Sequence, residues 1–95
     1  MMREGAQEHR YTGLILLSGV DSPGISSALF STLEPFSIVV LDIEQVVIRS
    51  RLILTVLIEL DPAHASAVEE DLNQCAIDLN VDIAISFGRE PAESI

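Results

Sequence analysis

The chain has 95 residues, enough for one compact domain, and 48% of them are hydrophobic, so a substantial core is possible. A formal net charge of -10, from 15 acidic side chains against five arginines and no lysine, disfavours nucleic acid and anionic membrane surfaces as partners. Cys75 is the only cysteine, which excludes an internal disulfide, and we expect a cytoplasmic protein because no apolar run has signal-peptide or membrane-spanning length.

A strand, a tight turn and a helix are expected after a polar leader at residues 1–10. The strand covers Tyr11–Ser18 and is apolar on both faces, which is typical of a central strand. In the turn, we expect Ser22 to act as the helix N-cap and Pro23 to occupy the first helical position. The helix should end before Pro35, because proline disfavours helical geometry in the preceding residue. It should bury three residues at helical spacing: Ile25, Leu29 and Leu33.

Two β-branched runs, Ile38–Ile48 and Leu52–Leu60, predict an antiparallel hairpin, because only Arg49-Ser50-Arg51 separates them. Alternate residues of the second run are apolar and should pack under the helices: Leu52, Leu54, Val56, Ile58 and Leu60. The opposite face of this run is also largely apolar and carries Ile53, Thr55, Leu57 and Glu59. An apolar face of this size in a small domain usually contacts another molecule, so we expect a second subunit.

A second helix and a last strand complete the domain. Asp61-Pro62 repeats the cap-then-proline pattern, and Asn80 is expected to end the helix. The alternation of apolar and polar residues over Val81–Phe87 predicts a half-buried strand. We therefore place the domain at residues 11–88 and expect residues 89–95 to begin a linker or tail. The helix should carry one apolar stripe, which consists of Ala65, Val68, Leu72, Cys75, Ala76 and Leu79.

The order β-α-β-β-α-β predicts a ferredoxin-like α/β sandwich, with a four-stranded antiparallel sheet, two helices on one face and the first and third strands central. Many unrelated functions use this fold, so topology alone decides none. RNA binding is disfavoured, because Leu52–Leu60 has no aromatic residue for base stacking. No nucleophile/base pair is present, and neither His9 nor His64 has a partner at ligand spacing. We therefore expect no catalytic residue and no metal site in this chain.

The turn S-G-V-D-S-P-G-I at residues 18–25 is the candidate binding site. Gly24 lacks a Cβ, so an outside group can approach the backbone N–H groups of the first helical turn, whose partial positive charge attracts a carboxylate. Asp21 offers a negative charge to an ammonium group. A zwitterion such as an amino acid would then be held at both ends. The alternative is a tight strand-to-helix turn that binds no ligand.

Three charged residues further along the chain leave two interpretations open. Asp42 lies in a predicted strand, where aspartate is disfavoured, and is either a surface charge on an edge strand or a polar group kept for a ligand. Arg49 and Arg51 either solvate the hairpin tip or pair with acids across an interface.

The sequence resembles an ACT domain, an amino-acid-sensing regulatory module attached to many metabolic enzymes. The run G-V-D-S-P-G-I carries this resemblance, and L-D-I-E-Q-V-V-I-R-S-R-L resembles the N-terminal ACT region of actinobacterial-type phosphoserine phosphatases. The similarity covers Tyr11–Phe87. It implies a homodimer that binds a small amino acid, with L-serine as the expected effector because serine is the pathway product. The matching positions are Gly19, Asp21, Gly24 and Ile25 in the turn, with Asp42 and Ile43 reaching the effector from the partner module.

One departure concerns catalysis. The phosphatases resembled have a haloacid-dehalogenase catalytic domain with a D-x-D-x-T motif, and neither Asp42-Ile43-Glu44 nor Asp78–Asp82 reproduces it. Magnesium is therefore expected only in a full-length phosphatase parent, and no cofactor in this chain. The chain is either a regulatory fragment of such an enzyme or a stand-alone ACT protein, and a purely structural dimerisation module remains the alternative to a sensor.

Overall fold

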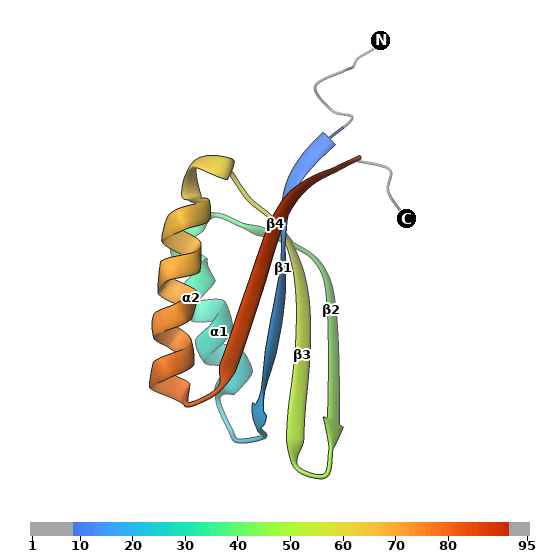
Figure 1. Ribbon diagram of the computed structural model, residues 1–95, viewed down its shortest axis with the longest axis vertical. Helices are drawn as coiled ribbons and strands as arrows, with labels where there is room; N and C mark the ends of the chain where they lie inside the picture. Colours follow the sequence, from blue (N-terminus) through green and yellow to red (C-terminus); the bar gives the residue numbers. More distant parts are fainter. Residues whose placement is uncertain (1–8, 92–95) are drawn as a thin grey trace.

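A computed structural model describes residues 9–91, which form one four-stranded sheet with two helices on one face (Figure 1). All neighbouring strands are antiparallel, in the order β2-β3-β1-β4, so the first and third strands are central as predicted. The ferredoxin-like arrangement is thereby confirmed. The elements are β1 (His9–Val20), α1 (Ile25–Leu33), η2 (Glu34–Phe36), β2 (Val39–Ile48), β3 (Arg51–Glu59), η3 (Pro62–His64), α2 (Ala65–Leu79) and β4 (Asp82–Pro91).

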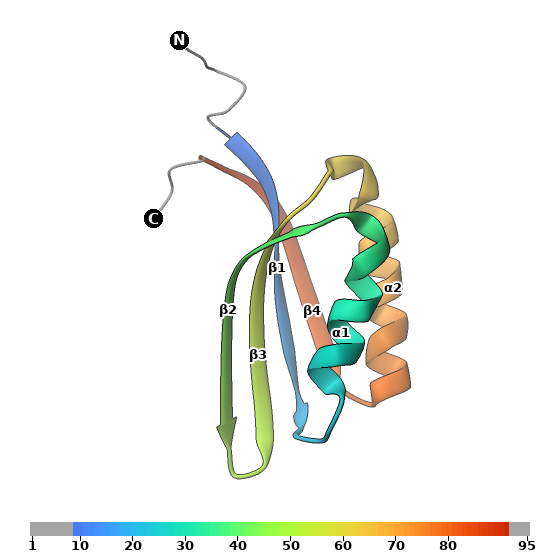
Figure 2. The same ribbon diagram turned by 180° about the vertical axis from the view of Figure 1, so that it is seen from behind.

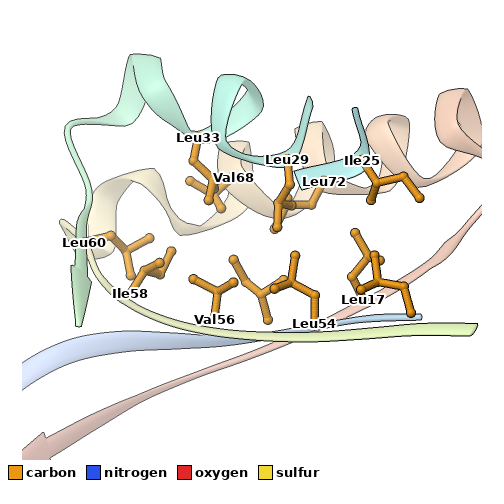
Figure 3. Close-up of a cluster of buried hydrophobic side chains, with 12 residues drawn as sticks. Leu17, Ile25, Leu29, Leu33, Leu54, Val56, Ile58, Leu60, Val68 and Leu72 are labelled. Atoms are coloured by element: carbon orange, nitrogen blue, oxygen red, sulfur yellow. The ribbon is translucent and has the colours of Figure 1, made fainter. Parts of the chain in front are cut away.

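The core lies between the helices and the sheet (Figure 3). Its sheet side is formed by alternate residues of the central strands, because successive side chains of a strand point to opposite faces. Burying each large aliphatic side chain stabilises the fold by about 1.5–3 kcal/mol. The predicted alternation in β3 and both helix stripes are confirmed by burial of Ile15, Leu17, Ile25, Leu29, Leu33, Leu52, Leu54, Val56, Ile58, Val68, Leu72 and Cys75.

The hairpin between β2 and β3 is also confirmed, and its turn is tighter than expected. Arg49 and Ser50 have positive φ angles of 52° and 67°, which is the geometry of a two-residue type I′ turn. Arg51, expected in the break, instead pairs with Ile48 and begins β3. The right-handed twist of the flanking strands favours this turn type and fixes the register of the whole hairpin.

The second helix begins later than the sequence predicts. Asp61 does act as a cap, since its Oδ1 accepts a hydrogen bond from the backbone N–H of Ala63 at 2.9 Å. This cap starts the short η3 helix, and α2 follows from Ala65. The helix ends as predicted at Asn80, whose φ of 58° stops helical propagation.

The first and last strands in the chain extend past the expected domain edges. Residues 89–91, expected to begin a linker, instead pair with residues 9–11 of β1, so this expectation is corrected. The Tyr11 ring stacks on Phe87 with a centroid separation of 5.9 Å, and the Arg89 guanidinium lies 5.4 Å from the Tyr11 ring centroid. These ring contacts hold together strand ends whose polar composition resembles a linker. The expectations for residues 1–8 and 92–95 lie outside the described residues.

Neither helix over residues 9–91 is long and apolar enough to cross a membrane. Figure 2 shows α1 and α2 side by side over one face of the sheet, with β2 at the sheet edge.

Candidate functional site

The β1–α1 loop differs in detail from the sequence prediction. Gly24 has φ 89° and ψ -3°, which matches the third position of a type II turn, where proline is favoured immediately before the glycine. Pro23 is therefore a turn residue, and α1 begins at Ile25. Ser22 is not the N-cap, because Gly24 occupies that position and the helix starts too late for Ser22 to cap it.

The start of α1 is accessible, which is the property the candidate site requires. Within residues 9–91, no side chain forms a capping hydrogen bond at this end of the helix. The first backbone N–H groups of a helix have no intrahelical acceptor and carry partial positive charge. A Cβ placed on Gly24 would have no described atom within 4 Å, so the space beside these groups is open. A small anion can therefore approach the helix start.

Asp21 lies on the same loop and is exposed. Its backbone N–H donates a hydrogen bond to the carbonyl oxygen of Ser50 at 2.8 Å. This bond ties the loop to the β2–β3 turn and holds the Asp21 backbone at a fixed place beside α1. The sequence did not reveal the contact, because it joins main-chain groups from two separate turns and no side-chain pattern encodes it.

Gly19 and Ile25 have clear packing roles. A Cβ on Gly19 would lie 2.7 Å from Cγ1 of Val81, so only glycine allows β1 to approach the start of β4 this closely. Ile25 is 3% exposed and its side chain belongs to the core. Neither residue therefore offers a side chain to the candidate site, and Ile25 contributes the first N–H of α1.

Asp42 and Ile43 lie on the edge strand β2, directly after an irregularity in register between Val40 and Asp42. Both are exposed, and Oδ1 of Asp42 accepts a hydrogen bond from the backbone N–H of Ile43 at 2.9 Å. The aspartate is thus tolerated in the strand because it sits at a bulge on a solvated edge.

Within one chain, the structure does not bring the two groups of candidate residues together. Asp42 pairs with Leu57 of β3, whereas Val20 at the loop pairs with Arg51. These β3 partners are six residues apart, so Asp42 lies roughly 20 Å along the strands and two strands away from Val20, or about 22 Å in all. A ligand of amino-acid size cannot contact both groups in a single copy.

A shallow open hollow of about 500 Å³ lies on the flank of α1 that faces the chain leading into β2. Of the described residues that line it, none belongs to the predicted site, and sequence analysis did not single it out. Its surface is mostly hydroxyl-bearing and apolar: Ser27, Phe30, Ser31, Leu33, Glu34, Ser37 and Ile38.

Among residues 9–91, no three His, Cys, Asp or Glu side chains converge to hold a metal ion. The ring of His64 lies against Phe36 with centroids 5.9 Å apart, and Cys75 is buried in the core.

Comparison with known proteins identifies relatives of this chain. The sequence model of the ACT domain matches residues 12–86. Phosphoserine phosphatase SerB2 of Mycobacterium tuberculosis is 42% identical over 74 residues, which cover 76% of this chain and 18% of that protein. The phosphoserine phosphatase of Streptomyces coelicolor is 47% identical over 51 residues, which cover 54% of this chain and 12% of that protein.

An ACT domain protein from Streptococcus pneumoniae has the same fold, with a TM-score of 0.72 at 19% identity over 82% of this chain and 90% of its own. The chain spans less than a fifth of the length of either phosphatase. The match over residues 12–86 shows that the chain belongs to the ACT domain family.

Proposed function

We propose that this chain is the regulatory module of a phosphoserine phosphatase, and that it binds L-serine or a similar small amino acid between two copies. The observation that carries the proposal is the uncapped start of α1 beside the exposed carboxylate of Asp21. The relatives that are phosphoserine phosphatases support the assignment to such an enzyme. The resemblance to amino-acid-sensing modules supports a small amino acid as the ligand.

The chemistry of the loop fits the two charges of an amino acid. The ligand carboxylate would accept hydrogen bonds from the first N–H groups of α1, an interaction worth about 0.3–1 kcal/mol where exposed and up to about 2 kcal/mol where partly buried. The ligand ammonium would pair with Asp21. Contacts this weak hold a small ligand with useful affinity only in an enclosed pocket, and a second copy of the chain would enclose the site.

The exposed edge of β2 is the surface that supports dimerisation. Edge strands that stay unpaired are usually short or carry charges, proline or bulges that prevent association. β2 has two acidic residues and an irregularity near Asp42, but it is ten residues long. Six of its large hydrophobic side chains are exposed: Val39, Val40, Ile43, Val46, Val47 and Ile48. An antiparallel pairing with β2 of a second copy would satisfy the open backbone edge and continue the sheet.

Charge excludes one register for this pairing and allows another. A two-fold axis at Glu44 would place two carboxylates directly opposite each other, which is destabilising. An axis at Gln45 avoids this, because an amide can donate to and accept from its own symmetry mate. Ile43 would then lie opposite Val47 of the second copy, and both residues are on the helix-covered side of the sheet.

The same register would shorten the gap between the two groups of candidate residues. Asp42 would lie opposite Ile48 of the second copy, in the row that contains that copy's Arg51 and Val20. The separation between Asp42 and the other copy's Val20 would be three strand spacings, or roughly 14 Å, against about 22 Å within one chain. The two groups of candidate residues would therefore lie closer together between copies than within one copy.

Regulation would follow from this placement. A ligand bound between copies stabilises one arrangement of the pair, and linkage allows that preference to bias a catalytic unit attached elsewhere in a longer parent.

Thermal melts against the twenty amino acids test the proposal. A ligand that binds only the folded state raises stability by about 2.7 kcal/mol at a hundred times its dissociation constant. We expect a response to serine or a close analogue that Asp21→Asn removes. Asp71→Asn, on the exposed surface of α2, is the matched control. A dimeric chain that responds to no amino acid would instead be a purely structural dimerisation module.

A further inference from the structure

The turn between β2 and β3 carries two arginines that have no carboxylate partner in the described part of the chain. That part contains four arginines and no lysine. Arg10 pairs with Glu59 at 3.9 Å, and the Arg89 guanidinium lies 5.4 Å from the centroid of an aromatic ring. Arg49 and Arg51 form no ion pair among the described residues, and both are exposed. Two positive charges are therefore left free in a chain whose net charge is -10.

This turn lies beside the loop of the proposed amino-acid site. Figure 1 shows the β1–α1 loop and the β2–β3 turn at the same end of the sheet. Arg51 forms the last pair of the β1–β3 ladder with Val20, so their Cα atoms are about 4.5–5.5 Å apart. The next residue, Asp21, donates its backbone N–H to the carbonyl oxygen of Ser50 at 2.8 Å. Ser50 lies between the two arginines in the sequence, so the main chain holds both of them close to the loop.

Both side chains can approach the loop from the end of the sheet. Arg51 leaves β3 on the side away from the helices, because its neighbour Leu52 is buried beneath them. Since the pair with Val20 is the last in the ladder, no strand residue stands between Arg51 and the loop. The long side chain of Arg51 therefore passes around the end of the sheet. Arg49 lies in the turn itself, with a φ angle of 52°.

Asp21 does not neutralise the two arginines. Its carboxylate is exposed and forms no ion pair with either guanidinium in the described part of the chain, although the two backbones are hydrogen-bonded. The loop and the turn together offer one negative side chain, two positive side chains and the partial positive charge at the start of α1. A ligand with one ammonium group, one carboxylate and a second anionic group matches this set of charges.

We propose that the site binds an amino acid whose side chain is phosphorylated, and that Arg49 and Arg51 bind the phosphate. This rests on the proposed function, from which it takes the ligand carboxylate at the start of α1 and the ammonium group at Asp21. A phosphorylated serine carries a charge of about -1.5 to -2 on its phosphate at pH 7, which two guanidinium groups balance. A planar guanidinium also matches phosphate through two parallel hydrogen bonds. A side-chain carboxylate has a single charge and would leave one arginine unpaired.

This ligand changes what the module would report. In the proposed parent enzyme, the phosphorylated amino acid is the substrate and the free amino acid is the product. A site that includes the two arginines favours the substrate. A site formed by the loop alone would bind both with similar affinity.

The competing partner for Arg51 is Asp42 of a second copy. In the β2 pairing proposed above, these two residues lie in one row, two strand spacings or about 10 Å apart. An ion pair between them would make Arg51 a contact between copies and not a ligand group. The two roles predict different results when Arg51 is changed.

Calorimetric titration of the full chain in about 0.15 M salt, where surface charges are screened beyond about 8 Å, tests the proposal. The probes are L-serine, O-phospho-L-serine, L-aspartate and inorganic phosphate. We expect O-phospho-L-serine to bind about tenfold more tightly than L-serine, because each exposed charge pair contributes up to about fivefold. L-aspartate should lie between the two. Inorganic phosphate should bind more weakly than O-phospho-L-serine, because it lacks the ammonium and carboxylate groups.

The ratio of the two dissociation constants, for L-serine and for O-phospho-L-serine, is the quantity to compare between variants. Both ligands use the same loop, so a change in folding or dimerisation alters both affinities and leaves the ratio unchanged. Arg49→Gln and Arg51→Gln should each lower this ratio by about two- to fivefold, and the double variant should abolish the preference. Arg89→Gln is the matched control, because it removes the same charge about 30 Å away, at the other end of β1. It should leave the ratio as in wild type.

Four outcomes would overturn the proposal. L-serine that binds as tightly as O-phospho-L-serine would refute the phosphate site and leave the proposed function standing. Arg51→Gln that lowers the sedimenting mass without changing the ratio would assign Arg51 to Asp42 of a second copy. Inorganic phosphate as tight as O-phospho-L-serine would show a general anion patch. A chain that binds neither L-serine nor O-phospho-L-serine would refute the amino-acid site itself, and the phosphate site with it.

Discussion

Replacing Gly19 with alanine tests whether this glycine is required for packing or for binding. The new Cβ would lie 2.7 Å from Cγ1 and 3.1 Å from Cβ of Val81, so one of the two segments must move. Overpacking of this kind costs about 1–3 kcal/mol. For a domain of this size, a loss of about 2 kcal/mol corresponds to about 8–16 °C in melting temperature.

Urea titration at one fixed protein concentration measures the loss, since the stability of an associating protein depends on concentration. Gly88→Ala is the matched control, because its Cβ would meet no described atom within 4 Å, and we expect a change within about 0.5 kcal/mol. Val81→Ala removes the clashing methyl groups. The double variant should therefore be more stable than the sum of the single losses predicts, by about 1 kcal/mol.

Strict additivity of Gly19→Ala and Val81→Ala would refute the steric explanation. If the double variant recovers stability and still responds to an amino acid, then Gly19 serves the fold and not the ligand. If it recovers stability but has lost the response, the backbone at Gly19 takes part in binding.

Three further predictions concern single sites. Leu29 is fully buried between α1 and the sheet, so Leu29→Ala should lower the free energy of unfolding by about 2–5 kcal/mol through lost burial and the cavity left behind. The loss is measured as a lower urea midpoint, and a loss below about 1 kcal/mol would contradict the core assignment. Asp61→Ala removes the side-chain cap of η3 and should cost about 1 kcal/mol by calorimetry, while Asp61→Asn, which keeps a capping oxygen, should cost less. Gly24→Ala forces a side chain into positive φ and should cost about 1 kcal/mol in a chemical melt; no loss would mean that the type II turn is not needed.

The sequence predicts the fold well where one period dominates. The alternation from Leu52 to Leu60 has a single outcome in a sheet covered on one side, because a slip of one residue would expose every core side chain of β3. The polar break at Arg49-Ser50 is likewise so short that the two strand-like runs can be joined only as an antiparallel hairpin. Both elements were predicted correctly because local pattern and tertiary burial favour the same structure.

Prediction was less accurate where two local structures share one sequence signal. Pro23-Gly24 suits a type II turn and also a helix start, and only the φ of Gly24 shows that the turn is formed. Residues 89–91 have the polar composition of a linker, and the contacts of Phe87 and Arg89 with Tyr11 that hold this strand end join residues far apart in sequence. The candidate site was predicted as residue positions, but the distance between its two groups depends on the register of β3 and could not be derived from local pattern.

The left-handed conformation of Gly24 leaves the start of α1 without a side-chain cap. A serine or aspartate at this N-cap would satisfy the helix start and add about 1 kcal/mol, but the positive φ of the turn selects glycine and leaves α1 without that cap. A bound carboxylate would supply the missing acceptors, so binding and helix stability become linked. Ile25, the first residue of α1, is buried against the sheet, and Asp21 is bonded to the β2–β3 turn. Ligand binding at this helix start would therefore stabilise the start of α1 and the loop that is hydrogen-bonded to the β2–β3 turn. This turn ends β2, the edge strand through which copies of the chain are proposed to pair, so amino-acid binding and pairing would be coupled.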